Sequence, residues 1–207
     1  MHIQIVLFDG FDPLDVIAPL EVLRAAGASV ELVSADGPRT APADGSWSVP
    51  SGMAGVSLSA VAPVAPTDWL LVPGAAGSSE EEITGRLAAT LRTPLPGLVA
   101  AALADPTVKV ATVCGGALIL AMAGLITGRA AVTHHDGMPA LAAAGVRAID
   151  ARVVDDGDLV TGGGVTSGLD VGLYLAEREI GAHAARTVER LLAYERRGVV
   201  WRDPVPA

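Results

Sequence analysis

The sequence predicts an α/β fold in which a doubly wound, mostly parallel sheet carries helices on both faces. Short, continuous apolar runs alternate along the chain with helix-like segments, and such runs are typical of parallel strands that are buried on both faces. Hydrophobic residues make up 51% of the 207 residues and aromatic residues only 3%, so the core must be built from Ala, Val, Leu and Ile. No linker interrupts the pattern, and we expect a single domain over residues 1–207.

The composition also narrows the function classes. A net charge of −9 without a basic cluster argues against nucleic acid and against an anionic membrane surface as partners. The N-terminus lacks a basic segment of the kind that opens a signal peptide, and the longest apolar stretch, around Gly115–Leu125, is too short to span a bilayer. One cysteine cannot form an internal disulfide, so we expect a cytoplasmic location. No metal-ligand spacing is evident, and we expect neither a metal nor another cofactor.

The first elements form a predicted βαβ unit. Ile3–Phe8 is a continuous apolar run of strand length, and Val30–Ala35 is a second one. Between them, Asp12 is placed to cap a helix that has Pro13 at its first position. Gly27 is expected to end this helix in the left-handed conformation. The two strands should therefore be parallel.

The next segment, Asp36–Ser59, is rich in Gly, Pro and Ser and reads as a loop with a short edge strand around Trp47 and Val49. Asp68–Val72 is the third core strand, and it runs into the small-residue loop Pro73–Gly77.

The remaining elements follow from helical spacing or from β-branched runs. Helices are expected over Glu80–Leu91, Pro96–Ala104, Met138–Ala144, Leu169–Glu179 and His183–Arg197. Strands are expected over Ala130–Thr133 and, as a hairpin, over Arg152–Asp155 and Leu159–Thr161. Ser167 is a plausible cap for the helix that it precedes, and the tail with Pro204 and Pro206 should be loose.

The chain is organised around the stretch Val108–Ala121. It opens as a buried strand, reaches Cys114, turns at Gly115 and Gly116, and continues as an apolar helix. Such a turn exposes the side chain at its apex and directs helix N–H groups toward it, so we expect Cys114 to have a depressed pKa. The alternative is that a lone cysteine is simply a small buried apolar residue.

Four segments should meet beyond the carboxyl ends of the strands, where ligands bind in doubly wound sheets. They are Asp9–Asp15, Pro73–Gly77, Cys114–Gly116 and Thr133–His135. Among the carboxylates, Asp15 is the candidate acid and base, because it lies among apolar neighbours that would raise its pKa. The alternative is that Asp15 only favours the helix dipole, an interpretation that suits Asp9 and Asp12 better.

His134 has two interpretations as well. It could orient or deprotonate Cys114, or it could cap the end of a strand through its ring nitrogens. Spacing alone slightly favours the second. The run Gly162–Gly164 is a weak phosphate signal, because it matches neither a P-loop nor a dinucleotide-binding pattern.

Several motifs together resemble the DJ-1/PfpI superfamily. They are Gly10–Val16, Leu71–Gly74, Val113–Ala117, Val132–His134 and Thr161–Asp170. The last of these, with Asp15, looks most like the isocyanide hydratase branch. The resemblance implies a flavodoxin-like fold, a homodimer, and a nucleophilic Cys114 that works with the acidic Asp15.

The sequence departs from the pattern of its relatives at two positions. Isocyanide hydratases usually carry Thr where this chain has Gly115, and the family's Pro-Gly-Gly ends here in Ala75. PfpI-type peptidases place His directly after the cysteine, so Gly115 also removes the main support for a protease.

From the residues and the resemblance we expect a cofactor-independent hydratase that converts a small isocyanide into an N-substituted formamide. Cys114 would attack the terminal carbon and Asp15 would supply the proton. Backbone donors around Gly74, Ala75 and Gly115, together with His134, would bind the substrate. The alternatives are a glyoxalase-like or amidase activity, in which His134 would matter more, and a non-catalytic redox sensor or ligand-binding protein.

Overall fold

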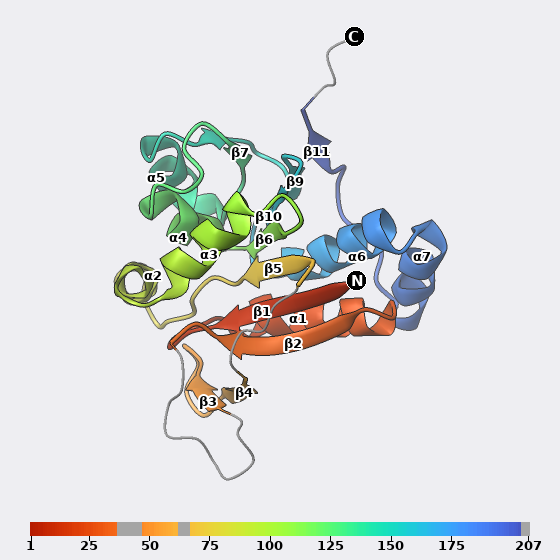
Figure 1. Ribbon diagram of the computed structural model, residues 1–207, viewed down its shortest axis with the longest axis horizontal. Helices are drawn as coiled ribbons and strands as arrows, with labels where there is room; N and C mark the ends of the chain where they lie inside the picture. Colours follow the sequence, from red (N-terminus) through yellow and green to blue (C-terminus); the bar gives the residue numbers. More distant parts are fainter. Residues whose placement is uncertain (37–46, 62–66, 204–207) are drawn as a thin grey trace.

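The computed structural model describes residues 1–36, 47–61 and 67–203, and a twisted central sheet organises them (Figure 1). The strand order is β11-β9-β10-β6-β5-β1-β2. The bounds are β1 His2–Leu7, β2 Ser29–Ser34, β5 Trp69–Val72, β6 Lys109–Val113, β9 Val153–Asp155, β10 Leu159–Gly162 and β11 Trp201–Arg202. Neighbouring strands of this sheet run parallel, except that β9 is antiparallel to β10. The predicted doubly wound, mostly parallel sheet is confirmed.

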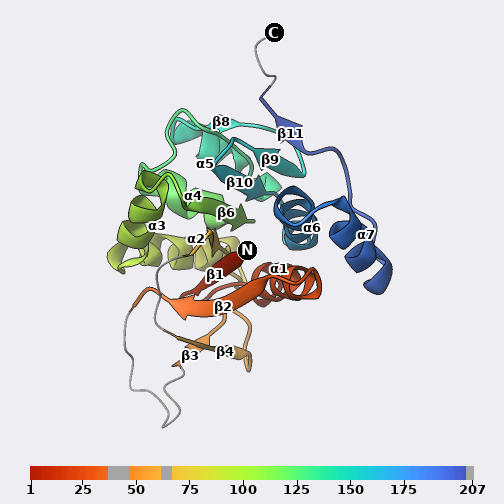
Figure 2. The ribbon, with the colours of Figure 1, turned by 45° about the vertical axis from the view of Figure 1, so that its right-hand side comes forward.

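Helices cover both faces of the sheet (Figure 2). One face carries α1 (Pro13–Ala25), α6 (Ser167–Glu179) and α7 (Ala182–Leu191), and α1 packs directly on α6. The other face carries α2 (Glu80–Ala89), α3 (Leu95–Ala104) and α4 (Gly116–Met122), with α5 (Met138–Ala143) packed on α4. Two small sheets, β3 (Trp47–Pro50) with β4 (Ser57–Ala60) and β7 (Ala130–Ala131) with β8 (Arg147–Ala148), lie outside the main one.

The first βαβ unit forms as predicted. The Asp12 side chain accepts a hydrogen bond of 2.8 Å from the Leu14 N–H, and Pro13 opens α1. Gly27 has a φ of +92°, which an L side chain rarely adopts, so glycine is required where the chain leaves the helix. β1 and β2 pair in parallel from His2↔Ser29 to Leu7↔Ser34.

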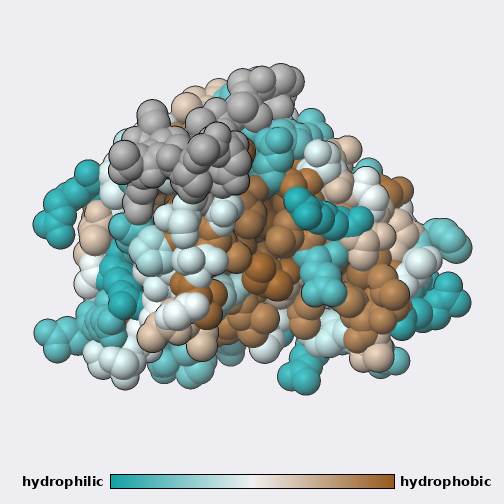
Figure 3. Space-filling view, turned by 90° about the horizontal axis from the view of Figure 1, so that it is seen from below, coloured by the Kyte–Doolittle hydropathy of each residue, from teal (hydrophilic) through white to brown (hydrophobic). Residues whose placement is uncertain are grey.

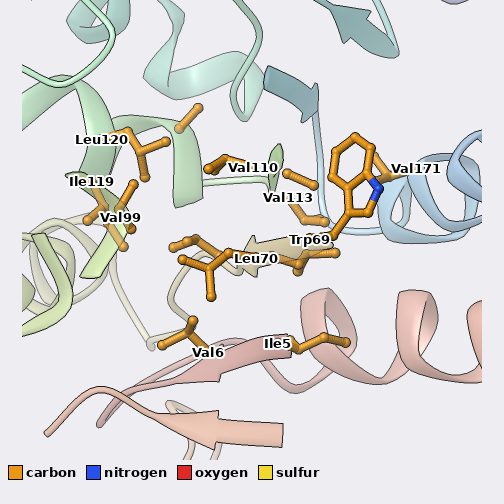
Figure 4. Packing of buried hydrophobic residues seen from close by; sticks show 14 of the residues in the cluster. Ile5, Val6, Trp69, Leu70, Val99, Val110, Val113, Ile119, Leu120 and Val171 are labelled. Carbon is orange, nitrogen blue, oxygen red and sulfur yellow. The ribbon is translucent and has the colours of Figure 1, made fainter. Parts of the chain in front are cut away.

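The core lies between the sheet and the two helical layers (Figure 4). Ile5, Leu70 and Val110 come from adjacent strands and are almost completely buried. Trp69 is the largest fully buried side chain, and the cations of Lys109 and Arg178 lie 5.3 and 5.4 Å from its ring centroid. Aliphatic side chains thus supply most of a core that has few aromatic rings.

Several predicted boundaries are wrong at the C-terminal end. The helix expected to reach Arg197 ends at Leu191, because Ala193 has a φ of +48° and turns the chain back toward α6. Ser167 does not cap α6: it is the first helical residue, and its hydroxyl has no partner among the described residues. The two-residue strand β11 was not predicted, because such a short segment has no readable period.

Three further predictions can be compared with the structure. The strand expected over Ala130–Thr133 is reduced to β7, and the helix expected to reach Leu91 leaves the α-helical conformation at Ala89 and continues as a 3₁₀ turn to Arg92. The predicted strand around Trp47 and Val49 is β3. The prediction of a loose tail at Pro204 and Pro206, and part of the predicted loop after Asp36, lie outside the described residues.

A search of the described helices for membrane spans finds no single helix with sufficient length and apolarity, although the bent pair Glu80–Arg92 and Leu95–Ala104 passes when taken together.

Candidate active site

The sharp turn between β6 and α4 holds Cys114 in a strained conformation. Its φ is +53°, in the left-handed region, which costs a non-glycine residue on the order of 1–3 kcal/mol. Two hydrogen bonds hold it there: its N–H donates to the Gly162 carbonyl at 3.0 Å, and its carbonyl accepts from the Thr133 hydroxyl at 2.7 Å. Only 7% of the side chain is exposed, so the apex of the turn faces a cavity rather than bulk solvent.

The two glycines after Cys114 permit close packing around the turn. A Cβ on Gly116 would lie 2.2 Å from the Val72 carbonyl oxygen, so β5 and the start of α4 approach as closely as only glycine allows. A Cβ on Gly115 would lie 3.0 Å from Leu87 Cδ1. Leu87 therefore occupies the space that a side chain at position 115 would need.

Asp15 lies beside this turn and is fully buried. Its Oδ2 accepts a hydrogen bond of 2.8 Å from the Gly74 N–H, whereas its Oδ1 has no partner among the described residues. Burial and the nearby charge of Asp12 raise the pKa of the Asp15 carboxyl well above its ordinary value of 3.8, although Gly74 and the Cys114 thiol act in the opposite direction. The predicted rise in this pKa is confirmed.

The expectation of a depressed pKa at Cys114 is wrong. Burial, followed by the negative charge of Asp15, raises the pKa of the Cys114 thiol above its ordinary value. The Gly115 N–H at the start of α4 lowers it, as the helix argument anticipates, but by less. Each group therefore holds its own proton more tightly than a solvated one does, and because each influences the pKa of the other, Cys114 and Asp15 titrate as a coupled pair.

The backbone donors divide into two groups. The Gly74 N–H is engaged by Asp15, so it is not available to a substrate. Gly115 directs its N–H toward the Cys114 sulfur. Ala75 lines the cavity, and no acceptor for its N–H is found within the described part of the chain. Ala75 is therefore the backbone donor that could stabilise charge on a bound substrate, whereas the Gly115 N–H stabilises charge on the sulfur.

His134 also lines the cavity, but it interacts with Asp136 rather than with Cys114. Its Nδ1 accepts from the Asp136 N–H at 3.4 Å and lies 3.3 Å from the Asp136 carboxylate, as expected for a capping histidine. His135 contacts the same carboxylate at 3.2 Å. The potential ligand atoms of the three side chains lie within 4.8 Å of one another, an arrangement that the sequence spacing did not indicate.

A cavity of about 670 Å³ opens onto Cys114. All four segments that were expected to meet at the carboxyl edge of the sheet contribute to its lining, through Asp12, Ala75, Cys114 and His134 among others. Gly162, in contrast, is a packing residue: a Cβ there would lie 2.6 Å from Val171 Cγ2 and 2.7 Å from the Ser167 hydroxyl. Gly162, rather than the whole glycine run, therefore lets α6 approach the sheet.

Two residues that support the site were not identified from the sequence. Thr133 anchors the Cys114 carbonyl, and its place in a motif next to His134 was the available signal. Arg86 joins three loops around the site: it donates to the Gly52 and Ala76 carbonyls, and its side chain fills the space that a Cβ on Gly10 would need. No sequence signal distinguishes Arg86 from an ordinary helix-surface arginine.

Comparison with solved structures shows the same architecture elsewhere. A ThiJ/PfpI family protein from Pseudomonas syringae has 27% sequence identity and a TM-score of 0.77, and the match covers 99% of this chain and 76% of that one. DJ-1beta from Drosophila melanogaster has 22% identity and a TM-score of 0.77, with coverage of 94% and 98%, and it supports the fold alone.

Comparison of sequences is more specific. The chain is 46% identical over 88 residues to an isonitrile hydratase from Pseudomonas putida; the alignment covers 41% of this chain and only 37% of that protein. It is 34% identical over 146 residues to an uncharacterized Streptomyces lividans protein encoded in the cpoL 5′ region, of which 92% is covered. The DJ-1/PfpI family model matches residues 1–178. With its thiol at the turn after β6 and its flavodoxin-like sheet, this chain belongs to the DJ-1/PfpI family.

Proposed function

We propose that this protein is an isocyanide hydratase in which Cys114 and Asp15 carry out the reaction. The observation that carries the proposal is the buried pair itself. A carboxyl with a raised pKa, one of whose oxygens has no hydrogen-bond partner among the described residues, lies beside a thiol that lines a largely apolar cavity. The partial likeness to an isonitrile hydratase supports the choice of substrate.

The first step forms the covalent intermediate. As the Cys114 sulfur attacks the terminal isocyanide carbon, the proton held by the pair passes through Asp15 to the same carbon. A carbon–sulfur bond and a carbon–hydrogen bond form, which gives a thioimidate of the type S–CH=N–R. A thiol that keeps its proton until the substrate arrives suits this step, because the proton must be delivered with the nucleophile.

Water completes the reaction. Its hydroxyl adds to the thioimidate carbon and its proton goes to nitrogen, and Asp15 can act as the base and acid for these transfers. The carbon–sulfur bond then breaks as the carbonyl forms, and the hydroxyl proton returns to the Cys114–Asp15 pair. The product is an N-substituted formamide. The Ala75 N–H would stabilise charge that develops on the substrate along this path, and the Gly115 N–H would stabilise charge on the sulfur.

The other candidate functions are less well supported. A glyoxalase-like or amidase reaction would rely on His134 as a base, and His134 is engaged by Asp136. A redox sensor needs an accessible thiolate, whereas Cys114 is buried and its pKa is raised.

The direct test is product formation from n-butyl isocyanide. The wild-type protein should yield N-butylformamide, identified by NMR, and mass spectrometry should find a transient adduct on Cys114. The variants Cys114→Ser and Cys114→Ala should fold, as judged by circular dichroism, and yield only the uncatalysed background. Formamide production by Cys114→Ala at the wild-type rate would overturn the proposal.

The proposal extends to assembly and location. Apolar side chains gather in the middle of the face drawn in Figure 3, between polar ones, and an apolar area of this kind supports a homodimer. The free thiol suits the reducing cytoplasm. Light scattering at micromolar concentration should give the mass of two chains, and a monomer mass would contradict the dimer.

A further inference from the structure

The cavity continues well beyond Cys114 along an apolar path. Three helices on the same side of the sheet form its walls: α2 contributes Ile83 and Leu87, α4 contributes Leu118 and Met122, and α5 contributes Ala140 (Figure 2). Leu118 fills the space left by the missing side chain of Gly137, because a Cβ on Gly137 would lie 2.7 Å from Leu118 Cδ1. Aliphatic side chains from three helices thus line much of the cavity, beside the polar groups that also face it.

The size of this space exceeds what the reaction requires. About 670 Å³ lies within the range of sites that hold drug-sized ligands. The reacting group of an isocyanide has only two atoms and would lie next to Cys114, which lines the cavity. The rest of the volume is thus available to the group attached to nitrogen.

The charged groups along the cavity are all of one sign. Asp12, Glu80 and Asp136 line it, and among the described lining residues there is no Lys or Arg. A substrate that carries a carboxylate would meet repulsion without a compensating cation. An uncharged apolar substituent meets no such cost.

Building on the proposed function, we infer that the substrates are uncharged isocyanides with a large apolar substituent that lies against α2, α4 and α5. Ala140 both lines the cavity and is exposed, so it lies where the cavity opens to solvent at α5, and its small side chain makes it a specificity-determining residue there. Each methylene buried on this path should contribute favourably until the chain reaches solvent.

The first experiment measures kcat/KM for n-alkyl isocyanides from ethyl to octyl. The value should rise by about fourfold per methylene over the first few carbons, the change expected for full burial of each one. An isocyanide that ends in a carboxylate should react more slowly than its uncharged methyl ester. A flat series, or a carboxylate that reacts as fast as the ester, would overturn the inference.

A matched pair of variants tests the path itself. Ala140→Phe should block the α5 end and lower the ratio of octyl to ethyl kcat/KM by tenfold or more. Ala142 is exposed like Ala140 but is not part of the cavity lining, so Ala142→Phe should keep the wild-type ratio. Equal ratios in the two variants would contradict the assignment of Ala140.

A second probe separates this inference from the proposed function. N-alkylmaleimides react with the Cys114 thiol without any turnover, and glutathione provides the reference for intrinsic reactivity. Relative to glutathione, the rate at Cys114 should increase with alkyl length and fall in Ala140→Phe. If this result is found without formamide production, the proposed hydratase activity is refuted and the inferred binding of the apolar substituent is supported. If formamide is produced but chain length affects neither probe, only the inferred binding of the substituent is refuted.

Discussion

Two buried aspartates lie in the first turns of two helices that pack against each other, and their carboxylates differ in the number of hydrogen-bond partners. Asp15 in α1 and Asp170 in α6 are 0% and 2% exposed. Asp170 accepts from Arg152 Nε at 2.7 Å, from the Arg197 N–H at 2.8 Å and from the Tyr194 hydroxyl at 3.0 Å. Asp15 accepts from one backbone donor, and within the described part of the chain its other oxygen has no hydrogen-bond partner.

This difference separates a structural carboxylate from a reactive one. A buried charge is tolerated where hydrogen bonds and a cation compensate for lost water, as they do around Asp170. At Asp15 the compensation is incomplete, so the pKa rises and the group can exchange a proton. Two equally buried carboxylates can therefore have different roles, and the number of hydrogen-bond and ion-pair partners determines whether the carboxylate is structural or reactive.

The largest effect that we predict is on stability at Asp170. Asp170→Asn removes the charge that compensates Arg152 and should lower the free energy of unfolding by about 3 kcal/mol. Urea denaturation measures this loss. Activity per folded molecule should remain, because Asp170 is not part of the cavity lining. A decrease in the free energy of unfolding of less than about 1 kcal/mol would contradict this prediction, because it would show that the ion pair contributes no more than an exposed surface pair.

The next effect concerns turnover at Asp15. Asp15→Asn preserves shape but cannot exchange a proton, so kcat for an alkyl isocyanide should fall by roughly 10²-fold or more. Mass spectrometry should still detect alkylation of Cys114 by iodoacetamide. Asp170→Asn, assayed at a temperature where it is folded, serves as the control. Near-normal turnover by Asp15→Asn would make Asp15 structural and leave His134 as the next candidate.

A smaller effect is the pH dependence of stability. Folded Asp15 binds its proton more tightly than unfolded Asp15, so its contribution to the free energy of unfolding should decrease as the pH rises above 3.8. Asp15→Asn lacks this contribution. The wild-type minus variant difference, from urea denaturation between about pH 4 and pH 8, should therefore decline with pH. A difference that increases with pH would mean that the carboxylate is stabilised on folding.

The sequence allowed the position of the site to be predicted, because that position depends on local patterns. The β-branched run before Cys114, the two glycines after it and the cap at Asp12 each identify a strand end or a helix start, and parallel strands bring these ends to one edge. The meeting of the four segments follows from topology without knowledge of any contact.

The electrostatics of the site could not be predicted in the same way. The pKa of Cys114 depends on how completely it is buried and on its approach to Asp15, which is far away in the sequence. The helix N-terminus, which lowers the pKa of Cys114, could be predicted from the sequence. Burial and the charge of Asp15, which raise this pKa by more, could not. Likewise, the loop contacts of Arg86 and the true end of α7 depend on tertiary packing rather than on local spacing.

The central claim is that the titrations of Asp15 and Cys114 are coupled, and one measurement tests it directly. The rate of Cys114 alkylation by iodoacetamide is followed against pH in the wild-type protein and in Asp15→Asn. The wild-type midpoint should lie above that of a free thiol, about pH 8.5, and Asp15→Asn should move it to lower pH by removing the neighbouring negative charge. Superimposable profiles would show that the two groups are not coupled and would contradict the account.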